Sequence, residues 1–403
     1  MQTLLTSLSD PTVWQDFLNL RTEDGHTKKK ELVRLKAFVE NKLYVEIAKN
    51  IISGNYMFDF PVKTEINKSG STKKRIVYRF DSEETLVLKL LAHLLYKYDN
   101  KLSPACYSFR KHLTAKNAFD KITSIPHLAD KYVLKVDIHN YFNSIPPLRL
   151  VDEIKNVIDD DPPLQQLFVN LVLANKAYYY NETGERLLIT ENRGAMAGVP
   201  VSAFFANIYL TSMDETFTKI GVPYFRYSDD IIVFADNGDD LQRYKDLIFS
   251  IIEEKGLTIN PTKVKISAPG EEWEFLGFCY RNGYVDLASA TLHKIKSKIK
   301  RKAKALMRSQ VRKGRSFDDV AADLIDHFNR KFYREFSDND FTWCRWFFPV
   351  ITTAESLKAI DNYLVEYVRF LRSGRHTKKN FVVDYAEIKE LGFKSLVNAY
   401  YKK

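Results

Sequence analysis

Residues 224–234 read YFRYSDDIIVF, a stretch that places two adjacent acids between two apolar, β-rich arms. This pattern predicts a β-hairpin that carries Asp229 and Asp230 at its turn. Two carboxylates in an apolar frame repel each other and lose solvation, so without a cation at least one of them should be driven toward protonation. A divalent metal ion would relieve both penalties. For an Asp-Asp pair taken alone, the simpler alternative is a solvated turn.

A third acid ends another β-rich run. Residues 132–137 read YVLKVD, and the run stops at Asp137. We expect an acid at the carboxyl end of a buried strand to face a cleft. If Asp137 and Asp229 come together, they could share two Mg²⁺ ions about 3.5 to 4 Å apart, because hard oxygen ligands suit magnesium.

The composition indicates a soluble globular chain. It has 403 residues, of which 45% are hydrophobic, enough to fill the cores of roughly two to four structural units. Cys106, Cys279 and Cys344 form no CxxC pair, so we expect neither a disulfide framework nor a zinc site. No apolar run approaches the roughly 18 residues of a membrane span, and the N-terminus lacks a signal-peptide pattern. We therefore expect a cytoplasmic protein with no membrane segment.

The net charge of +10 is concentrated in one place. Residues 287–317 contain eleven Lys and Arg and no acid. Within this stretch Leu292, Ile295, Ile299, Ala303 and Leu306 recur at steps of three and four, which predicts a helix with one apolar stripe and a cationic remainder. Such a helix could bind a polyanion, and the alternative is a solvated charged face.

The rest of the chain is read more coarsely. Residues 1–60 have helical periodicity, and a basic turn at Lys68–Ser71 predicts a hairpin that precedes a helix capped by Ser82. Strands and helices alternate from Lys131 to Val285. The many aromatic residues between Phe328 and Phe348 could stack on bases, although a packed core is the more usual meaning of such spacing.

Seven motifs in register resemble those of the reverse transcriptases. Tyr227-Ser228-Asp229-Asp230 is similar to their Tyr-x-Asp-Asp signature, and Val136-Asp137 with Tyr141-Phe142 is similar to the strand that carries their first catalytic Asp. The remaining matches, in the family's order, are residues 72–76 (fingertip), 102–110 (ending in Tyr-x-Phe-Arg), 198–210 (template-side loop and helix), 260–263 and 275–278 (primer grip).

The resemblance implies an α+β right-hand polymerase fold with an antiparallel palm sheet and a helical C-terminal extension. We expect an N-terminal helical region at residues 1–60, fingers at 61–130, and a palm at 131–286 with a fingers-like insertion near 145–195. A basic thumb and the extension would then occupy residues 287–403. The implied activity is that of an RNA-directed DNA polymerase.

The resemblance also implies roles for individual residues. Asp137, Asp229 and Asp230 would be catalytic and, with the Ile138 carbonyl, would bind two Mg²⁺ ions, for which Mn²⁺ could substitute. The dNTP would contact Phe142, a barrier to a ribose 2′-hydroxyl, and four basic residues: Lys68, Lys74, Arg75 and Lys263. The last of these could instead be a surface lysine. Template and primer would contact Arg110, Gly198, Ser202, Tyr227, Phe275, Leu276, Gly277, Lys294, Lys298, Arg301 and Lys302.

One departure from the family lies in the template-side loop. Many reverse transcriptases have Pro-Gln-Gly where this chain has Met196-Ala197-Gly198, so the customary glutamine is replaced by Ala197. Diversity-generating retroelement enzymes have a similar loop but place Gln after the Ser, where this chain has Ala203. Retron and mobile-intron enzymes resemble the chain less closely than the class described next. The chain has neither the Val-Thr-Gly signature of retron enzymes after the primer grip nor an HNH endonuclease tail.

The bacterial defence-associated enzymes of the unknown-group and abortive-infection class resemble the chain more closely. The interpretation is therefore a reverse transcriptase of antiphage defence that copies a structured non-coding RNA into DNA. It could act as a homo-oligomer or with a partner reverse transcriptase. The alternatives are a diversity-generating enzyme and a nucleic-acid-binding module with a vestigial polymerase site. The template, the priming mode and the product sequence cannot be inferred from the sequence.

Overall fold

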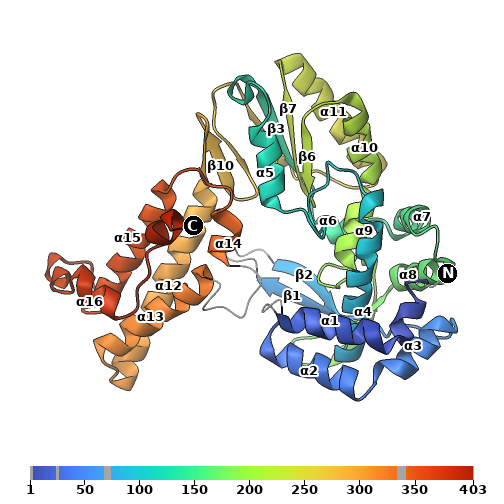
Figure 1. Ribbon diagram of the computed structural model, residues 1–403, viewed down its shortest axis with the longest axis horizontal. Helices are drawn as coiled ribbons and strands as arrows, with labels where there is room; N and C mark the ends of the chain where they lie inside the picture. Colours follow the sequence, from blue (N-terminus) through green and yellow to red (C-terminus); the bar gives the residue numbers. More distant parts are fainter. Residues whose placement is uncertain (1–2, 24–26, 68–73, 334–341, 403) are drawn as a thin grey trace. The chain divides into compact units, whose positions relative to one another are not determined.

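The computed structural model describes residues 3–23, 27–67, 74–333 and 342–402. The chain divides into two compact units, which are described separately below (Figure 1). The first contains residues 1–23 and 29–269, and the second contains residues 24–28 and 270–403. In the described residues no helix is both long and apolar enough to cross a membrane.

Helices open the first unit. They are α1 (Pro11–Glu23), α2 (Lys29–Glu40), α3 (Tyr44–Ile52), α4 (Ser82–Leu94) and α5 (Ala115–Thr123). Asp81, rather than the expected Ser82, caps α4, because its side chain accepts the Glu84 N–H at 2.8 Å. Aspartate suits this position because its carboxylate both accepts the bond and favours the positive end of the helix dipole.

A four-stranded sheet in the first unit has the order β2-β1-β4-β5. Its strands are β1 (Val62–Asn67), β2 (Lys74–Arg79), β4 (Lys176–Tyr180) and β5 (Arg186–Thr190). The first two pair antiparallel, as the predicted basic hairpin requires, whereas β1 and β4 pair in parallel. The helices α6 (Tyr141–Ser144), α7 (Pro147–Val157) and α8 (Pro162–Leu173) precede β4 in the sequence.

A second four-stranded sheet, entirely antiparallel, has the order β6-β7-β3-β8. Its strands are β3 (Tyr132–Asp137), β6 (Tyr224–Tyr227), β7 (Asp230–Ala235) and β8 (Lys265–Ser267). The helix α11 (Gly238–Glu254) packs on β3 and β7, and α10 (Thr211–Ile220) packs on β6 (Figure 1). Together with α9 (Ser202–Tyr209) these helices contribute to a continuous core whose buried residues range from Leu5 to Leu257.

The second unit starts with a three-stranded sheet in the order β11-β10-β9. These strands are β9 (Trp273–Phe275), β10 (Phe278–Arg281) and β11 (Tyr284–Leu287). The predicted basic helix is α12 (Ser289–Lys313), which buries Ile295, Ile299, Ala303 and Leu306. It packs on α13 (Phe317–Phe332) and α15 (Glu355–Phe370), and the remaining helices are α14 (Trp343–Phe347), α16 (Tyr385–Glu390) and α17 (Leu396–Tyr401).

The aromatic-rich stretch of the second unit forms a packed core. Phe332 contacts both Phe328 and Trp343 at ring-centroid distances of 5.7 and 5.8 Å, and all three rings are buried. Phe336 and Phe341 lie outside the described residues. Mixed helices and antiparallel sheets confirm the α+β class that was predicted.

Candidate active site

Strand pairing in the first unit brings the three predicted acids together. Asp137 at the end of β3 lies directly opposite Asp230, the first residue of β7. Tyr227 also pairs with Asp230, so Ser228 and Asp229 form the turn between β6 and β7. Ser228 has φ +61°, the left-handed conformation that so tight a turn demands. The backbone N–H of Ile138 donates to the carbonyl of Asp229 at 3.2 Å, which fixes the turn beside the end of β3.

Burial and the neighbouring carboxylates disfavour the ionised forms of Asp229 and Asp230. Burial, followed by the nearby charges of Asp230 and Asp137, raises the pKa of Asp229 to about 6. Burial also raises the pKa of Asp230, an effect that Asp137 reinforces and Lys135 opposes. Carboxylates respond in this way when they share a poorly solvated site, because each charge disfavours the next.

Two lysines offset part of this charge. The Nζ atom of Lys263 lies 2.6 Å from Oδ2 of the buried Asp137. Lys135, which the sequence analysis did not single out, places its Nζ atom 3.4 Å from Oδ1 of Asp230. Lys135 lies two residues before Asp137 on β3, so its side chain leaves the same face of the sheet, and this spacing is the signal that could have identified it.

The three carboxylates are suitable ligands for magnesium, but they do not surround an ion on all sides. Among the residues that the structure describes, no three His, Cys, Asp or Glu side chains are grouped tightly enough to hold a metal ion by themselves. Magnesium is usually held by one or two carboxylates and keeps its other positions for water and substrate phosphates. The raised pKa of Asp229 and the lysines beside the other two acids are what a site for such cations would show in their absence.

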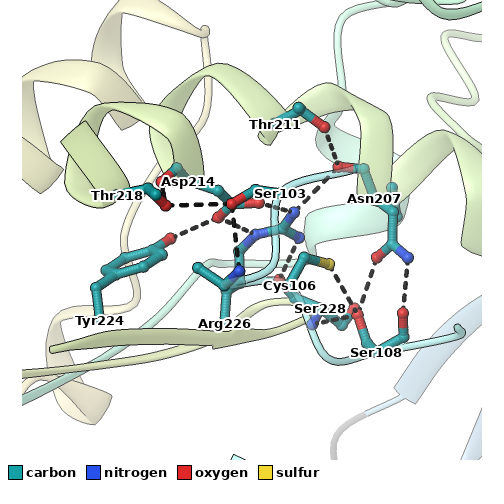
Figure 2. Close-up of polar contacts among 12 residues, drawn as sticks. Ser103, Cys106, Ser108, Asn207, Thr211, Asp214, Thr218, Tyr224, Arg226 and Ser228 are labelled. Atoms are coloured by element: carbon teal, nitrogen blue, oxygen red, sulfur yellow. Dashed lines mark hydrogen bonds and ion pairs between the residues drawn. The ribbon is translucent and has the colours of Figure 1, made fainter. Parts of the chain in front are cut away.

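A buried polar network supports the turn between β6 and β7 (Figure 2). Arg226 on β6 and Asp214 on α10 are both fully buried and form a two-pronged ion pair, with Nε–Oδ1 and Nη2–Oδ2 distances of 2.7 and 2.5 Å. Tyr224 donates its hydroxyl to the same carboxylate at 2.9 Å. Arg226 Nη1 then donates to the carbonyl of Ser228 at 3.3 Å, so the ion pair is linked to the turn between β6 and β7.

Ser108 joins the same network from a distant loop (Figure 2). Its hydroxyl accepts the backbone N–H of Ser228 at 2.8 Å and donates to Asn207 Oδ1 at 2.9 Å. Asn207 returns a bond from Nδ2 to the carbonyl of Ser108 at 2.7 Å. The turn is therefore held at both its N–H and its C=O by buried side chains, none of which the sequence analysis identified as functional.

Comparison with known proteins shows to which family the chain belongs. The family model described as "Reverse transcriptase (RNA-dependent DNA polymerase)" matches residues 66–280, more than half of the chain. The chain belongs to the reverse transcriptase family. It is thus an RNA-directed DNA polymerase by family, and the residues matched contain Asp137, Asp229 and Asp230.

Two retron enzymes are among the relatives of this reverse transcriptase. Retron Ec86 reverse transcriptase of Escherichia coli is 24% identical over 248 residues, which cover 60% of this chain and 69% of that protein. Retron Mx65 reverse transcriptase of Myxococcus xanthus is 23% identical over 192 residues, 46% of this chain and 43% of that protein. Bacterial reverse transcriptases are thus confirmed as relatives, including the retron enzymes that the sequence patterns placed behind the defence class.

Among solved structures, the chain is similar to apo telomerase from Candida tropicalis truncated from its C-terminal domain. The TM-score is 0.47 at 14% identity, and the match covers 57% of this chain and 55% of that one. A telomerase from Candida albicans, in complex with a TWJ fragment of telomeric RNA, matches with a TM-score of 0.48 at 11% identity.

Phe142 belongs to an aromatic group that includes Tyr227, the last residue of β6. Its half-buried ring is 6.3 Å from that of Phe109, which is itself 6.4 Å from the ring of Tyr227. The carbonyl of Phe142 accepts the N–H of Ala195 at 2.7 Å. Gly194, at φ +57°, lies so close to that carbonyl that a Cβ atom there would come within 2.5 Å of it. The backbone of Phe142 is therefore held rigidly, as a residue that gates the sugar would require.

The template-side loop is built on backbone contacts. Ala197 is buried, and its N–H donates to Asn143 Oδ1 at 2.9 Å while its carbonyl accepts the Tyr78 N–H at 2.8 Å. Gly198, at φ +100°, has no room for a side chain without crowding the carbonyl of Tyr78 at 3.1 Å. Ser202 is also buried and donates to the carbonyl of Met196 at 2.6 Å. These residues shape the loop, and their contact with a template stays a prediction.

Two of the predicted basic ligands of the dNTP lie on β2. Lys74 is exposed and pairs with Glu65 at 2.6 Å, and Arg75 is exposed beside it. Lys68 lies outside the described residues. Arg110, which was predicted to contact nucleic acid, donates to the carbonyls of Asp99 and Ser103 at 2.6 and 3.0 Å and so braces its own loop.

The predicted primer-grip and thumb residues belong to the second unit. Leu276 and Gly277 both have positive φ, and the Gly277 carbonyl accepts the Ala288 N–H at 2.9 Å, which ties the tight turn after Phe275 to the start of α12. The helix α12 carries Lys294, Lys298, Arg301 and Lys302. Burial, followed by the charges of Lys331 and Lys294, lowers the pKa of Lys298 to about 8, which marks a concentration of positive charge.

Proposed function

We propose that the chain synthesises DNA on an RNA template, with two Mg²⁺ ions held by Asp137, Asp229, Asp230 and the carbonyl of Ile138. The observation that supports this most directly is the register of β3 and β7, which sets Asp137 opposite Asp230 beside the Asp229 turn. When bound, the two ions would activate the primer 3′-hydroxyl and stabilise the departing pyrophosphate.

The protein's own groups would handle charge and protons. Lys263 neutralises Asp137 in the protein without metal, and its Nζ atom would be released for the triphosphate once cations neutralise that carboxylate. It could then give a proton to the leaving pyrophosphate. Lys74, Arg75 and Lys68 would hold the triphosphate, because guanidinium and ammonium groups match phosphate oxygens.

Selection of deoxynucleotides would rest on Phe142. Its ring lies next to that of Phe109, which in turn lies next to Tyr227, and the carbonyl of Phe142 is held by the N–H of Ala195. A ribose 2′-hydroxyl would collide with the Phe142 ring. The loop of Ala197, Gly198 and Ser202 would position the template base, and the basic face of α12 would bind the backbone of the product duplex.

The proposed biological role is antiphage defence in the cytoplasm. The enzyme would copy a structured non-coding RNA, and it could work as a homo-oligomer or with a partner reverse transcriptase. In support, the chain resembles defence-associated reverse transcriptases in its Val201-Ser202-Ala203-Phe204 stretch.

The proposal is tested by purifying the enzyme from its own cells and sequencing the RNA and DNA that accompany it. We expect one structured RNA and DNA complementary to it, with the DNA absent from an Asp229→Asn and Asp230→Asn double variant. A mixed population of cellular RNAs would contradict a dedicated template. Errors directed at template adenines would instead indicate a diversity-generating enzyme.

A further inference from the structure

A second cavity in the first unit has no part in the polymerase site. It has a volume of about 350 Å³ and lies among residues 56–60, the ends of β2 and α4, and α8. Its walls include four aromatic residues, Tyr56, Phe58, Phe60 and Phe80, and two buried charged side chains, Glu84 and Arg193. None of the residues that line it belongs to the proposed catalytic, nucleotide or template sets.

Arg193 is 2% exposed, yet most of its guanidinium is unused. Nη2 donates to the carbonyl of Leu171 at 3.4 Å, and neither Nε nor Nη1 has a hydrogen-bond partner among the described residues. The carboxylate of Glu191, two residues earlier, is taken by Lys63 at 2.5 Å and by the Tyr78 hydroxyl at 3.0 Å. A buried guanidinium left in this state is costly to the folded protein, which suggests that it serves a ligand.

Glu84, the other buried charged residue of the cavity lining, also has an unpaired polar atom. It is 5% exposed, and its Oε1 atom accepts the Tyr56 hydroxyl at 3.0 Å and the Asp59 N–H at 2.8 Å. Its Oε2 atom has no partner within the part of the chain that the structure describes. The lining of the cavity therefore includes two buried charged side chains that each carry unpaired polar atoms, together with several aromatic side chains.

We propose that this cavity binds a guanine base. Guanine presents two adjacent acceptors, O6 and N7, which an arginine can bond in pairs, and its neighbouring N1–H and N2–H groups are donors suited to a carboxylate. The planar ring suits the aromatic walls, since bases stack on such side chains irrespective of sequence. Adenine lacks the O6 acceptor and the N1–H donor, so the same groups would discriminate against it.

The base could come from two sources, a free guanine nucleotide or an unstacked guanosine of a bound RNA. Both would place the same base edges against Arg193 and Glu84. The exposed Asn170 also lines the cavity, so it marks the side from which a base enters.

Guanosine is the probe for the test, because it lacks the phosphates that the polymerase site would bind. Binding to the purified full-length protein is measured by calorimetry in EDTA, with adenosine and cytidine for comparison. A second arm measures competition by the oligoribonucleotides UUGUU and UUAUU. The variants are Arg193→Met, which keeps the length of the side chain, and Asn170→Trp, which obstructs the cavity from an exposed helical position. The Asp229→Asn and Asp230→Asn double variant separates this site from the polymerase site.

We expect saturable binding of guanosine that is weakened about tenfold or more by Arg193→Met and by Asn170→Trp, and that persists in the double variant. The Tm of Arg193→Met without ligand should equal or exceed that of the wild type, because a neutral side chain removes a poorly compensated buried charge. Competition by UUGUU alone would assign the base to RNA. Absence of guanosine binding at millimolar concentration, equal binding of adenosine, or undiminished binding by Arg193→Met would overturn the proposal.

Discussion

Asp214 and Arg226 form a fully buried ion pair whose guanidinium also bonds the carbonyl of Ser228 in the turn that carries Asp229 (Figure 2). The pair joins α10 to β6. The turn that carries Asp229 is therefore positioned from the protein interior, through the bond from Arg226 to the carbonyl of Ser228.

Removal of Asp214 should be strongly destabilising. Asp214→Ala would leave the Arg226 charge buried without its partner, and we expect a loss of about 3 to 5 kcal/mol in the free energy of unfolding. Urea denaturation measures this loss. Asp120→Ala, which removes the exposed partner of Lys116, is the matched control and should cost about 0.5 kcal/mol or less. A loss below about 1 kcal/mol for Asp214→Ala would show that the pair is not a structural element.

Ser108→Ala should impair catalysis more than substrate binding. The change leaves the Ser228 N–H without its acceptor, which costs about 1 to 3 kcal/mol and loosens the turn. We expect kcat for primer extension to fall about tenfold while KM for dNTP stays nearly constant, as for a residue that positions a catalytic group. The control Ser103→Ala alters the same loop without touching the turn. Equal kinetics for both variants would refute a positioning role.

Stability should depend on pH through Asp229. Because its pKa is raised to about 6 in the folded protein, the stabilising effect of its protonated form is complete below the unfolded value near 4 and is lost as the pH rises through 6. In EDTA, Asp229→Asn should exceed the wild type in stability by roughly 1 to 3 kcal/mol at pH 7, and by almost nothing at pH 4.

The measurement is urea unfolding at both pH values, with the exposed Asp152→Asn as control. Mg²⁺ should raise the Tm of the wild type and have less effect on Asp229→Asn, because cations bind the ionised carboxylate. A stability difference that is independent of pH would contradict the assignment of the raised pKa to this residue.

Phe142→Ala should admit ribonucleotides. Removal of the ring opens space at the proposed sugar position, so the ratio of kcat/KM for dNTP to that for rNTP should fall by about tenfold or more. Single-nucleotide primer extension with both substrates measures this ratio. Phe109→Ala removes the neighbouring ring and serves as the control. An unchanged ratio in Phe142→Ala would remove this residue from the sugar site.

Local patterns in the sequence were enough to predict the elements that carry the acids. The apolar runs ending at Asp137 and flanking Asp229 and Asp230 have the length and composition of strands, and they form β3, β6 and β7. The apolar stripe of α12 could also be predicted. Apolar residues that recur every three to four positions can be recognised without knowing which distant residues they contact.

Long-range pairings could not be predicted in the same way. The contact of Arg226 with Asp214 depends on how α10 packs on β6, and that of Ser108 with Ser228 spans 120 residues. No local period encodes either contact. The predicted cap of α4 was also wrong by one residue. Asp81 and Ser82 are both good capping residues, and Asp81 is the one with the extended backbone that a cap requires.

The central claim is that Asp137, Asp229 and Asp230 act together on one growing strand. Its most direct test is primer extension on a primed RNA by the Asp229→Asn and Asp230→Asn double variant, with binding to the same RNA measured in parallel. The account predicts that extension is abolished while affinity for the primed RNA changes little. Undiminished DNA synthesis by this variant would contradict it.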